Sequence, residues 1–180
     1  APVSSTLRQI EGQLDAVVTA PINKARMYEI GFRFPGQTEF FAERCGTKNF
    51  AMLLTGRSLT VALVTVHLPL REAIASLKTE EIVRVGLLLE DFLRRRGIEK
   101  PRIAVAGLNP HAGESGTLGR EEAAVIAPAV QQLQARIDNR QSEIDGPFSP
   151  DTIFHHAANG AWDAVLCMYH DQGLIPLKLH

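Results

Sequence analysis

Three short apolar runs, each ending beside a histidine, constrain the fold of this chain more than any other feature. They are VALVTVHLPL with His67, RIAVAGLNPHAGE with His111 and DAVLCMYHDQG with His170. Such runs are typical of buried parallel strands, because both faces of each strand are apolar. Stretches with helical periodicity separate them. The sequence therefore predicts an α/β fold with a largely parallel sheet flanked by helices.

The clearest predicted helix covers residues 79–96. Thr79 can cap it and Gly97 can end it, while its apolar stripe repeats at helical spacing. The stripe consists of Ile82, Val85, Leu89, Phe92 and Leu93. Strands are expected at 15–19, 50–54, 60–66, 102–106 and 163–168, and helices at 4–13, 23–31, after Pro35-Gly36, around Pro128 and at 150–158. Residues 138–151 are expected to be mainly loop, and the final PLKLH favours a strand.

Composition limits the classes of protein to consider. With 180 residues the chain can build one substantial core, and we expect no second complete domain. A net charge of -1 gives no reason to expect nucleic acid or an anionic membrane as a partner, and no apolar run reaches the roughly 20 residues that span a bilayer. We expect a cytoplasmic protein in which Cys45 and Cys167 are buried and reduced. The chain starts without Met and stops within PLKLH, so we expect a fragment of a longer enzyme.

The three histidines predict a shared metal site. The carboxyl ends of parallel strands meet at one edge of a sheet, where ligands collect. Three neutral imidazoles suit Zn²⁺ or a similar divalent ion that acts as a Lewis acid. Asp171 and Gln172 flank His170, and Glu114 follows His111, so each could anchor the second ring nitrogen of a ligand. The alternative is that each histidine is a hydrogen-bonded structural residue.

Other polar segments have two readings each. The glycine-rich loop at residues 113–122 could hold an anion at a helix start, or its acids could occupy a first helical turn. Lys178 could bind a phosphate or carboxylate at the rim of the site, or it could be a surface residue. Gln37 and Thr38 could bind a ligand near a helix start, or they could belong to a helix cap.

Six segments occur in an order that resembles one known family. They are DAVVTAPINK, PGQTEFFAE, VALVTVHLPL, GLNPHAGESGTLGREE, GPFSPDTIF and MYHDQGLIPLK. Together they resemble the PdxA family of 4-hydroxythreonine-4-phosphate dehydrogenases over nearly the whole chain, and LNPHAGE and MYHDQG are the most specific strings. The resemblance implies a fold like that of isocitrate and isopropylmalate dehydrogenases, with two α/β domains around a cleft and a homodimer. Residues 1–180 would then be a central α/β portion that lacks both termini.

The resemblance also implies an activity and a set of site residues. The family oxidises and decarboxylates 4-phosphooxy-L-threonine to 3-amino-2-oxopropyl phosphate with NAD, in pyridoxal phosphate biosynthesis. Its site combines histidines from both subunits, and the divalent ion would be Zn²⁺, or alternatively Mg²⁺, Mn²⁺ or Co²⁺. The implied metal ligands are His67, His111 and His170.

The resemblance further assigns substrate contacts. Gln37 and Thr38 match the substrate-contacting pair of the family, and Lys178 matches its substrate-binding lysine. The catalytic base is not identified by the sequence. Asp171 is a candidate, but it could equally serve only to orient His170. Lys178 is the second residue for which we expect a catalytic role.

One departure from the family pattern keeps other functions open. The family usually has G-H-T-E, whereas this chain has Gln37 in place of the histidine. Glutamine forms hydrogen bonds but carries no proton charge near neutral pH. A paralogue that acts on a related phosphorylated or dihydroxylated acid is one alternative. A metal-dependent hydrolase that uses the same histidines, or a catalytically incomplete dimerising chain, are the others.

Overall fold

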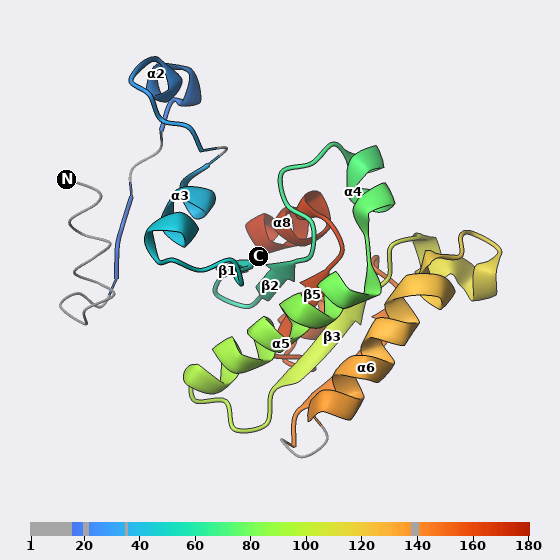
Figure 1. Ribbon diagram of the computed structural model, residues 1–180. Coiled ribbons are helices and arrows are strands. Elements are labelled where there is room, and N and C mark those ends of the chain that lie inside the picture. The colour runs from blue at the N-terminus through green and yellow to red at the C-terminus, as the bar shows by residue number, and fades with distance from the viewer. Residues whose placement is uncertain (1–15, 20–21, 35, 138–140) are drawn as a thin grey trace. The chain divides into compact units, whose positions relative to one another are not determined.

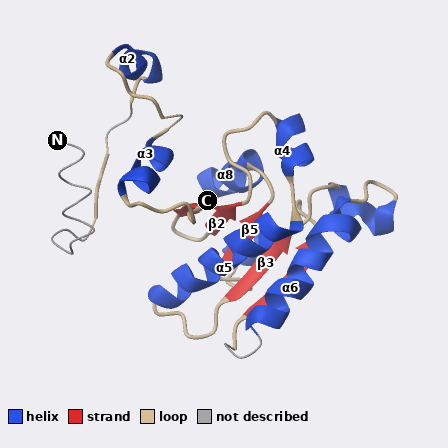
Figure 2. Cartoon of the chain, viewed as in Figure 1, coloured by secondary structure: helices blue, strands red, loops and turns tan. Residues whose placement is uncertain are grey.

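The computed structural model describes residues 16–19, 22–34, 36–137 and 141–180. The chain forms two compact units, residues 1–50 and residues 51–180, and each is described by itself. Figure 1 labels the elements and Figure 2 colours them by type. The helix predicted at 4–13 lies outside the described residues. Among the described residues, no helix has the length and apolar character needed to cross a membrane.

The described part of the first unit contains two short helices, α2 (Lys24–Glu29) and α3 (Gln37–Arg44). The side chain of Asn23 caps α2 by accepting a hydrogen bond from the backbone N–H of Arg26 at 3.2 Å. Gly36 occupies the N-cap position of α3, where it offers no side chain for a capping hydrogen bond. The predicted helices at 23–31 and after Pro35-Gly36 are therefore confirmed.

Two expectations for the first unit are wrong. Residues 16–19 form no strand, and Val18 is 97% exposed. A β-branched run becomes a strand only when a neighbouring strand accepts and donates its backbone hydrogen bonds, and the described residues of the first unit form no strand. Cys45, expected to be buried, is exposed directly after the last residue of α3, whereas Cys167 is buried as predicted.

The second unit is built on a five-stranded sheet in the order β1-β2-β5-β3-β4. Its first strand runs antiparallel to β2, and the other neighbours are parallel. The predicted α/β fold with a largely parallel sheet is confirmed. The bounds are β1 (Met52–Thr55), β2 (Thr60–Leu63), β3 (Arg102–Ala106), β4 (Glu143–Phe148) and β5 (Ala164–Cys167).

Helices cover both faces of this sheet. Alternate residues of each strand point to opposite faces, so Val105 packs with the α5–α6 layer while Ala104 packs with α7 and α8. In Figure 1, α5 and α6 run side by side across β3 and β5. The helices are α4 (Leu70–Ser76), α5 (Thr79–Arg95), α6 (Ala127–Ile137), α7 (Ile153–Ala158) and α8 (His170–Leu179), with a 3₁₀ segment η1 (Pro110–Gly116) and a π-helical turn η2 (Glu122–Ile126).

Helix α5 follows its predicted stripe closely. Ile82, Val85, Leu89 and Leu93 are buried, and Gly97 adopts a φ of +88° just after the helix. The expected cap is wrong, because the N-cap position is Lys78 and the hydroxyl of Thr79 instead donates to the carbonyl of Val125. That bond fastens α5 to the end of η2. Pro128, expected to kink its helix or to begin the second segment of that helix, is the second residue of α6.

Helix α4 was not predicted, and two other elements of the second unit differ from the sequence prediction. The segment expected to be loop contains β4, an edge strand in which only Ile144 is fully buried, so its apolar signal is weak. The carboxyl end, expected to favour a strand, is the last turn of α8. Leu174 and Leu177 pack on one side of that helix against the sheet, and this three-residue spacing is helical.

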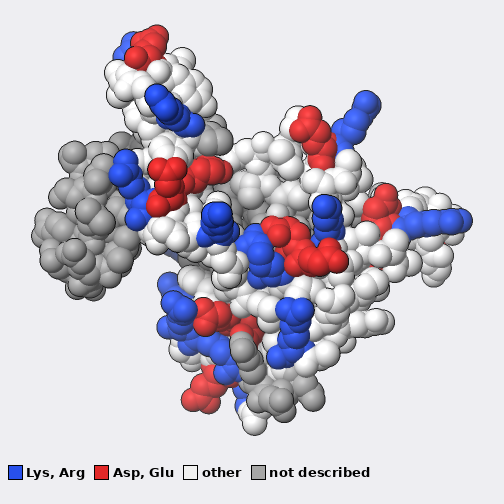
Figure 3. All heavy atoms as spheres, viewed as in Figure 1, with Lys and Arg blue, Asp and Glu red and all other residues white. Residues whose placement is uncertain are grey.

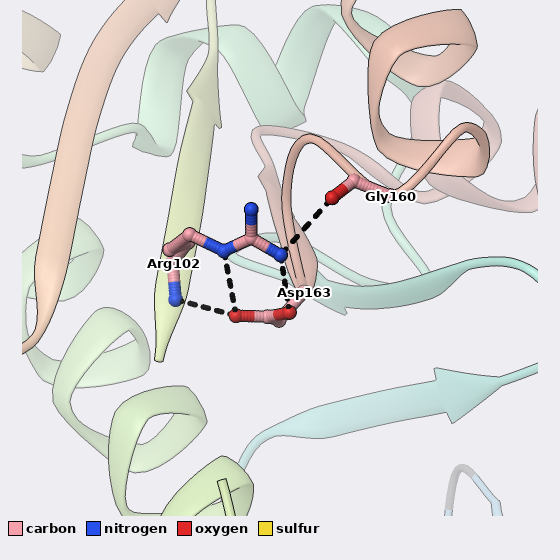
Figure 4. Close-up of polar contacts among 3 residues, drawn as sticks. All are labelled: Arg102, Gly160 and Asp163. Carbon is pink, nitrogen blue, oxygen red and sulfur yellow. Dashed lines mark hydrogen bonds and ion pairs between the residues drawn. The ribbon is translucent and has the colours of Figure 1, made fainter. Parts of the chain in front are cut away.

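An ion pair joins the amino ends of β3 and its neighbour β5. The guanidinium of Arg102 donates to both carboxylate oxygens of Asp163, at 3.3 and 3.0 Å, and to the carbonyl of Gly160 at 3.0 Å (Figure 4). The backbone N–H of Arg102 also donates to Asp163. This pairing raises the pKa of Arg102 above its ordinary value. It fixes the sheet at the edge opposite to the predicted site.

Candidate metal centre

Two of the three predicted histidines lie together at the carboxyl edge of the sheet. His67 follows β2 by four residues and is exposed, while His170 begins α8 after β5 and is partly buried. Their ring centroids are 5.5 Å apart and the rings are tilted by 46°. The pair lines a hollow of about 190 Å³ with apolar walls from Leu68, Leu70 and Ala73.

The two imidazole rings have the separation expected of two ligands that bind the same metal ion. Two imidazoles that bind one Zn²⁺ through bonds of about 2.1 Å at a tetrahedral angle have ring centroids about 5 Å apart. Nδ1 of His170 lies 2.7 Å from a carboxylate oxygen of Asp171, which is the carboxylate–histidine contact common at metal sites. His67 and His170 therefore fit a divalent ion in both spacing and donor type.

The third histidine stands apart from this pair. All six histidines are among the described residues, and there no group of three or more His, Cys, Asp or Glu side chains could hold a metal. His111 lies in η1, is 63% exposed, and its Nδ1 is 3.7 Å from the carboxylate of Glu114. The family resemblance implies that His111 joins the pair from a second copy of the chain. The three-histidine site stays a prediction.

The loop that carries His111 has an uncommon backbone. Residues 111–115 all have positive φ, from +44° to +78°, so the chain makes a left-handed helical turn there. Left-handed backbone costs about 1–2 kcal/mol for each residue other than glycine. Such conformations persist where surrounding contacts over-determine them, and they concentrate at functional sites.

A buried carboxylate supports this turn. Glu122 is 6% exposed and accepts hydrogen bonds from the backbone N–H of Leu108 and Asn109 and from the Asn109 side chain. Burial raises the pKa of Glu122, but these hydrogen bonds outweigh it and hold the pKa below its ordinary value. A Cβ on Gly113 would lie 2.6 Å from Glu122, and one on Gly119 would lie 2.3 Å from Asn109. These two glycines therefore make room for the network.

Asp171 lies in the first turn of α8 and Lys178 lies in its last turn. Lys178 is exposed in the last turn of α8, and eight residues of helix separate it from His170 by about 12 Å. A second hollow of about 500 Å³ lies between the start of α7 and α8, and Asp151, Tyr169 and Asp171 contribute to its lining. Tyr169 and Asp171 line both hollows, so these hollows adjoin at the start of α8.

The substrate-contact candidates Gln37 and Thr38 belong to the first unit. They are the first two residues of α3, and Gln37 accepts a hydrogen bond from the hydroxyl of Thr19 at 3.1 Å. Both side chains are partly buried. Their assignment to the substrate stays a prediction.

Sequence reasoning missed Tyr169, which lines both hollows, and Thr65, which is buried two residues before His67. The pKa of Tyr169 is raised by burial and, next, by the charge of Asp171. Its position directly before His170 is a signal the sequence offers. On the face of the second unit drawn in Figure 3, described basic and acidic side chains are interspersed.

Comparison with known proteins identifies the family. A family model described as pyridoxal phosphate biosynthetic protein PdxA matches residues 4–180. The chain belongs to the PdxA family. A 4-hydroxythreonine-4-phosphate dehydrogenase of Zymomonas mobilis is 47% identical over 171 residues, which are 93% of this chain and 50% of that protein. This chain thus spans about half the length of that PdxA relative.

Solved structures agree with this assignment. The crystal structure of 4-hydroxythreonine-4-phosphate dehydrogenase from Klebsiella pneumoniae superposes with a TM-score of 0.90 at 43% identity, covering 98% of this chain and 52% of that one. A terephthalate 1,2-cis-dihydrodiol dehydrogenase from Burkholderia xenovorans gives a TM-score of 0.76 at 29% identity, covering 99% and 55%. The resemblance drawn from the motifs and the predicted fold class are both confirmed.

Proposed function

We propose that this chain is part of a metal- and NAD-dependent dehydrogenase that oxidises and decarboxylates 4-phosphooxy-L-threonine, acting as a homodimer in pyridoxal phosphate biosynthesis. The observation that supports it most directly is the His67–His170 pair at the carboxyl edge of the sheet, with ring centroids 5.5 Å apart, in a member of the PdxA family. Names of relatives at 47% and 43% identity agree with this substrate.

The residues of the chain have distinct tasks in this proposal. A divalent ion, when bound, supplies Lewis acidity that stabilises negative charge on a substrate oxygen, and NAD accepts the hydride. His67 and His170 bind that ion together with His111 of a second copy. When Nδ1–H of His170 donates to Asp171, its Nε2 presents a lone pair to the ion, so the 2.7 Å contact favours an orienting role for Asp171.

Three further side chains bind and orient the substrate. Lys178 is a compact positive charge that suits the anionic end of a phosphorylated molecule. Gln37 and Thr38 supply hydrogen bonds that orient it. These groups act by binding and by holding geometry.

The test is NADH formation by the whole protein with 4-phosphooxy-L-threonine. His111→Ala and His170→Ala are expected to lower turnover by at least about 100-fold, because each removes a metal ligand. His156→Ala is the matched control, since His156 is an exposed histidine of α7, and it should stay within about twofold. Removal of metal by a chelator should abolish activity, and added Zn²⁺ or Mn²⁺ should restore it. Undiminished turnover in His111→Ala would defeat the proposal.

A second candidate function is favoured by Gln37. This residue replaces the histidine that the family usually has, and the structurally similar dihydrodiol dehydrogenase acts on a dihydroxylated acid. A paralogue that acts on a dihydroxylated acid would accept an unphosphorylated diol acid better than 4-phosphooxy-L-threonine. Comparing kcat/KM for these two substrate types, in the parent and in Gln37→His, separates the two functions.

A further inference from the structure

Four polar side chains of the second unit are almost completely buried among the described residues: Thr65, Glu90, Glu122 and Gln172. Glu90 lies on α5 and accepts hydrogen bonds from Arg94 and Ser142. The other three lie at the carboxyl edge of the sheet, close in sequence or by contact to the segments that carry the three histidines. A buried polar group is costly unless it is hydrogen-bonded, so the partners of these three groups are informative.

Thr65 joins the His67 segment to the end of β5. Its hydroxyl donates to the carbonyl of Met168 at 2.8 Å, and its backbone N–H donates to the same oxygen at 3.2 Å. His67 is two residues after Thr65, and His170 is two residues after Met168. This double contact therefore sets the two histidine segments against each other immediately before their imidazoles.

Gln172 joins the His170 segment to the end of β3. Its side-chain oxygen accepts from the N–H of Met168 at 2.6 Å, and its side-chain nitrogen donates to the carbonyl of Gly107 at 2.6 Å. The chain then runs only four residues from Gly107 to His111. The amide thus bridges two neighbouring strands at the point where each continues into a histidine-bearing loop.

Glu122 holds the loop of His111 from its other side. One of its oxygens accepts from the backbone N–H of Leu108 at 2.8 Å and of Asn109 at 2.7 Å, and the other accepts from the Asn109 side chain at 2.9 Å. Pro110 is then the sole residue between this anchored pair and His111. The left-handed turn starts from a fixed point.

We propose that Thr65, Gln172 and Glu122 are positioning residues that fix the three imidazoles for metal binding; this rests on the proposed metal-dependent function. Each acts through the backbone and touches no substrate. Sub-ångström placement of ligands decides metal affinity, and partners that orient ligands are typically worth about 10- to 100-fold in that affinity.

The test measures Zn²⁺ affinity of the whole protein by competition with a chromophoric chelator, and the absorption bands of the Co²⁺-loaded protein as a report on ligand geometry. Thr65→Val keeps the side-chain shape and leaves the Met168 carbonyl bonded to the Thr65 N–H, so the fold is retained. It is expected to weaken Zn²⁺ binding by about 10-fold or more and to shift the Co²⁺ bands. Thr65→Ser retains the hydroxyl and should restore both to parent values.

Gln172→Leu and a remote control complete the set. Gln172→Leu should weaken Zn²⁺ binding by about 10- to 100-fold, because it frees β3 from β5 at the site. Glu90→Gln removes charge from a buried group on α5, and it should leave Zn²⁺ affinity and the Co²⁺ bands unchanged even if the protein unfolds at a lower temperature.

Two failures are distinguishable. Parent-like affinity and Co²⁺ bands in Thr65→Val and Gln172→Leu, together with lost affinity in His170→Ala, overturn the positioning role alone. Parent-like affinity in all three variants, His170→Ala included, overturns the metal site and this inference with it.

Discussion

Replacing Gly113 by alanine is expected to destabilise the protein more than replacing Gly116, although both glycines have positive φ. The backbone term is similar in the two positions, since φ is +78° at Gly113 and +93° at Gly116, and alanine there costs about 1–2 kcal/mol. The surroundings differ. A Cβ on Gly113 would lie 2.6 Å from an oxygen of Glu122, whereas a Cβ on Gly116 would have nothing within 4 Å.

The contact at Gly113 adds a second contribution to the loss of stability. An ordinary contact is 3.4–4 Å, so the Glu122 carboxylate would have to retreat by about 1 Å and weaken its bonds to the backbone N–H groups of Leu108 and Asn109. Loss of hydrogen bonds to a charged, buried acceptor costs about 1.5–3 kcal/mol. Gly113→Ala should therefore cost about 2.5–5 kcal/mol and Gly116→Ala about 1–2 kcal/mol.

Urea unfolding of the whole protein, at one fixed protein concentration, measures both changes. The free energies of unfolding should differ between the variants by about 1.5–3 kcal/mol, with parent m-values. Adding Glu122→Ala to Gly113→Ala removes the obstructing side chain, so the two substitutions together should cost less than the sum of their separate costs. Equal destabilisation by Gly113→Ala and Gly116→Ala would refute the account of the turn.

Gly86→Ala on α5 is expected to destabilise the protein by about 1 kcal/mol despite its gain in helix propensity, because its Cβ would lie 2.8 Å from Leu133. A double-mutant cycle with Leu133→Ala should show favourable coupling of about 1 kcal/mol or more. Additive effects would contradict this contact. Burial raises the pKa of Cys167, so iodoacetamide should label the exposed Cys45 in the folded protein and Cys167 only after unfolding, as peptide mass spectrometry can check. The pKa of Glu122 is lower in the folded state than its ordinary value of 4.5. The ionised carboxylate therefore stabilises the protein fully at a pH above 4.5, and this stabilisation is lost as the pH falls through the folded-state pKa. The stability deficit of Glu122→Gln at pH 7 should therefore shrink in acid, and a deficit independent of pH would contradict the hydrogen-bond network.

The sequence predicted most reliably the long amphipathic helix and the strands whose two faces are both apolar. The stripe of α5 and the runs of β2, β3 and β5 were predictable because each buries apolar side chains at the period of its element. The pairing of His67 and His170 was predictable from the same logic, since both follow parallel strands that are neighbours in the sheet.

The parts that were missed depend on contacts between distant residues. Edge strand β4 has a single fully buried residue, Ile144, so its pattern resembles a loop. The left-handed turn at 111–115 is set by Glu122, and that carboxylate looks in sequence like an ordinary acid of a first helical turn. The position of His111 relative to His67 and His170 depends on a second copy in the proposed account, and no local pattern encodes it.

The most direct test of the metal site is a crystal structure of the whole protein grown with Zn²⁺, with anomalous diffraction recorded on both sides of the zinc absorption edge. The account predicts one strong anomalous peak per site, about 2.1 Å from nitrogens of His67 and His170 of one subunit and His111 of its partner. A zinc ion bound elsewhere, or an imidazole of His111 directed away from the pair in every copy, would contradict it.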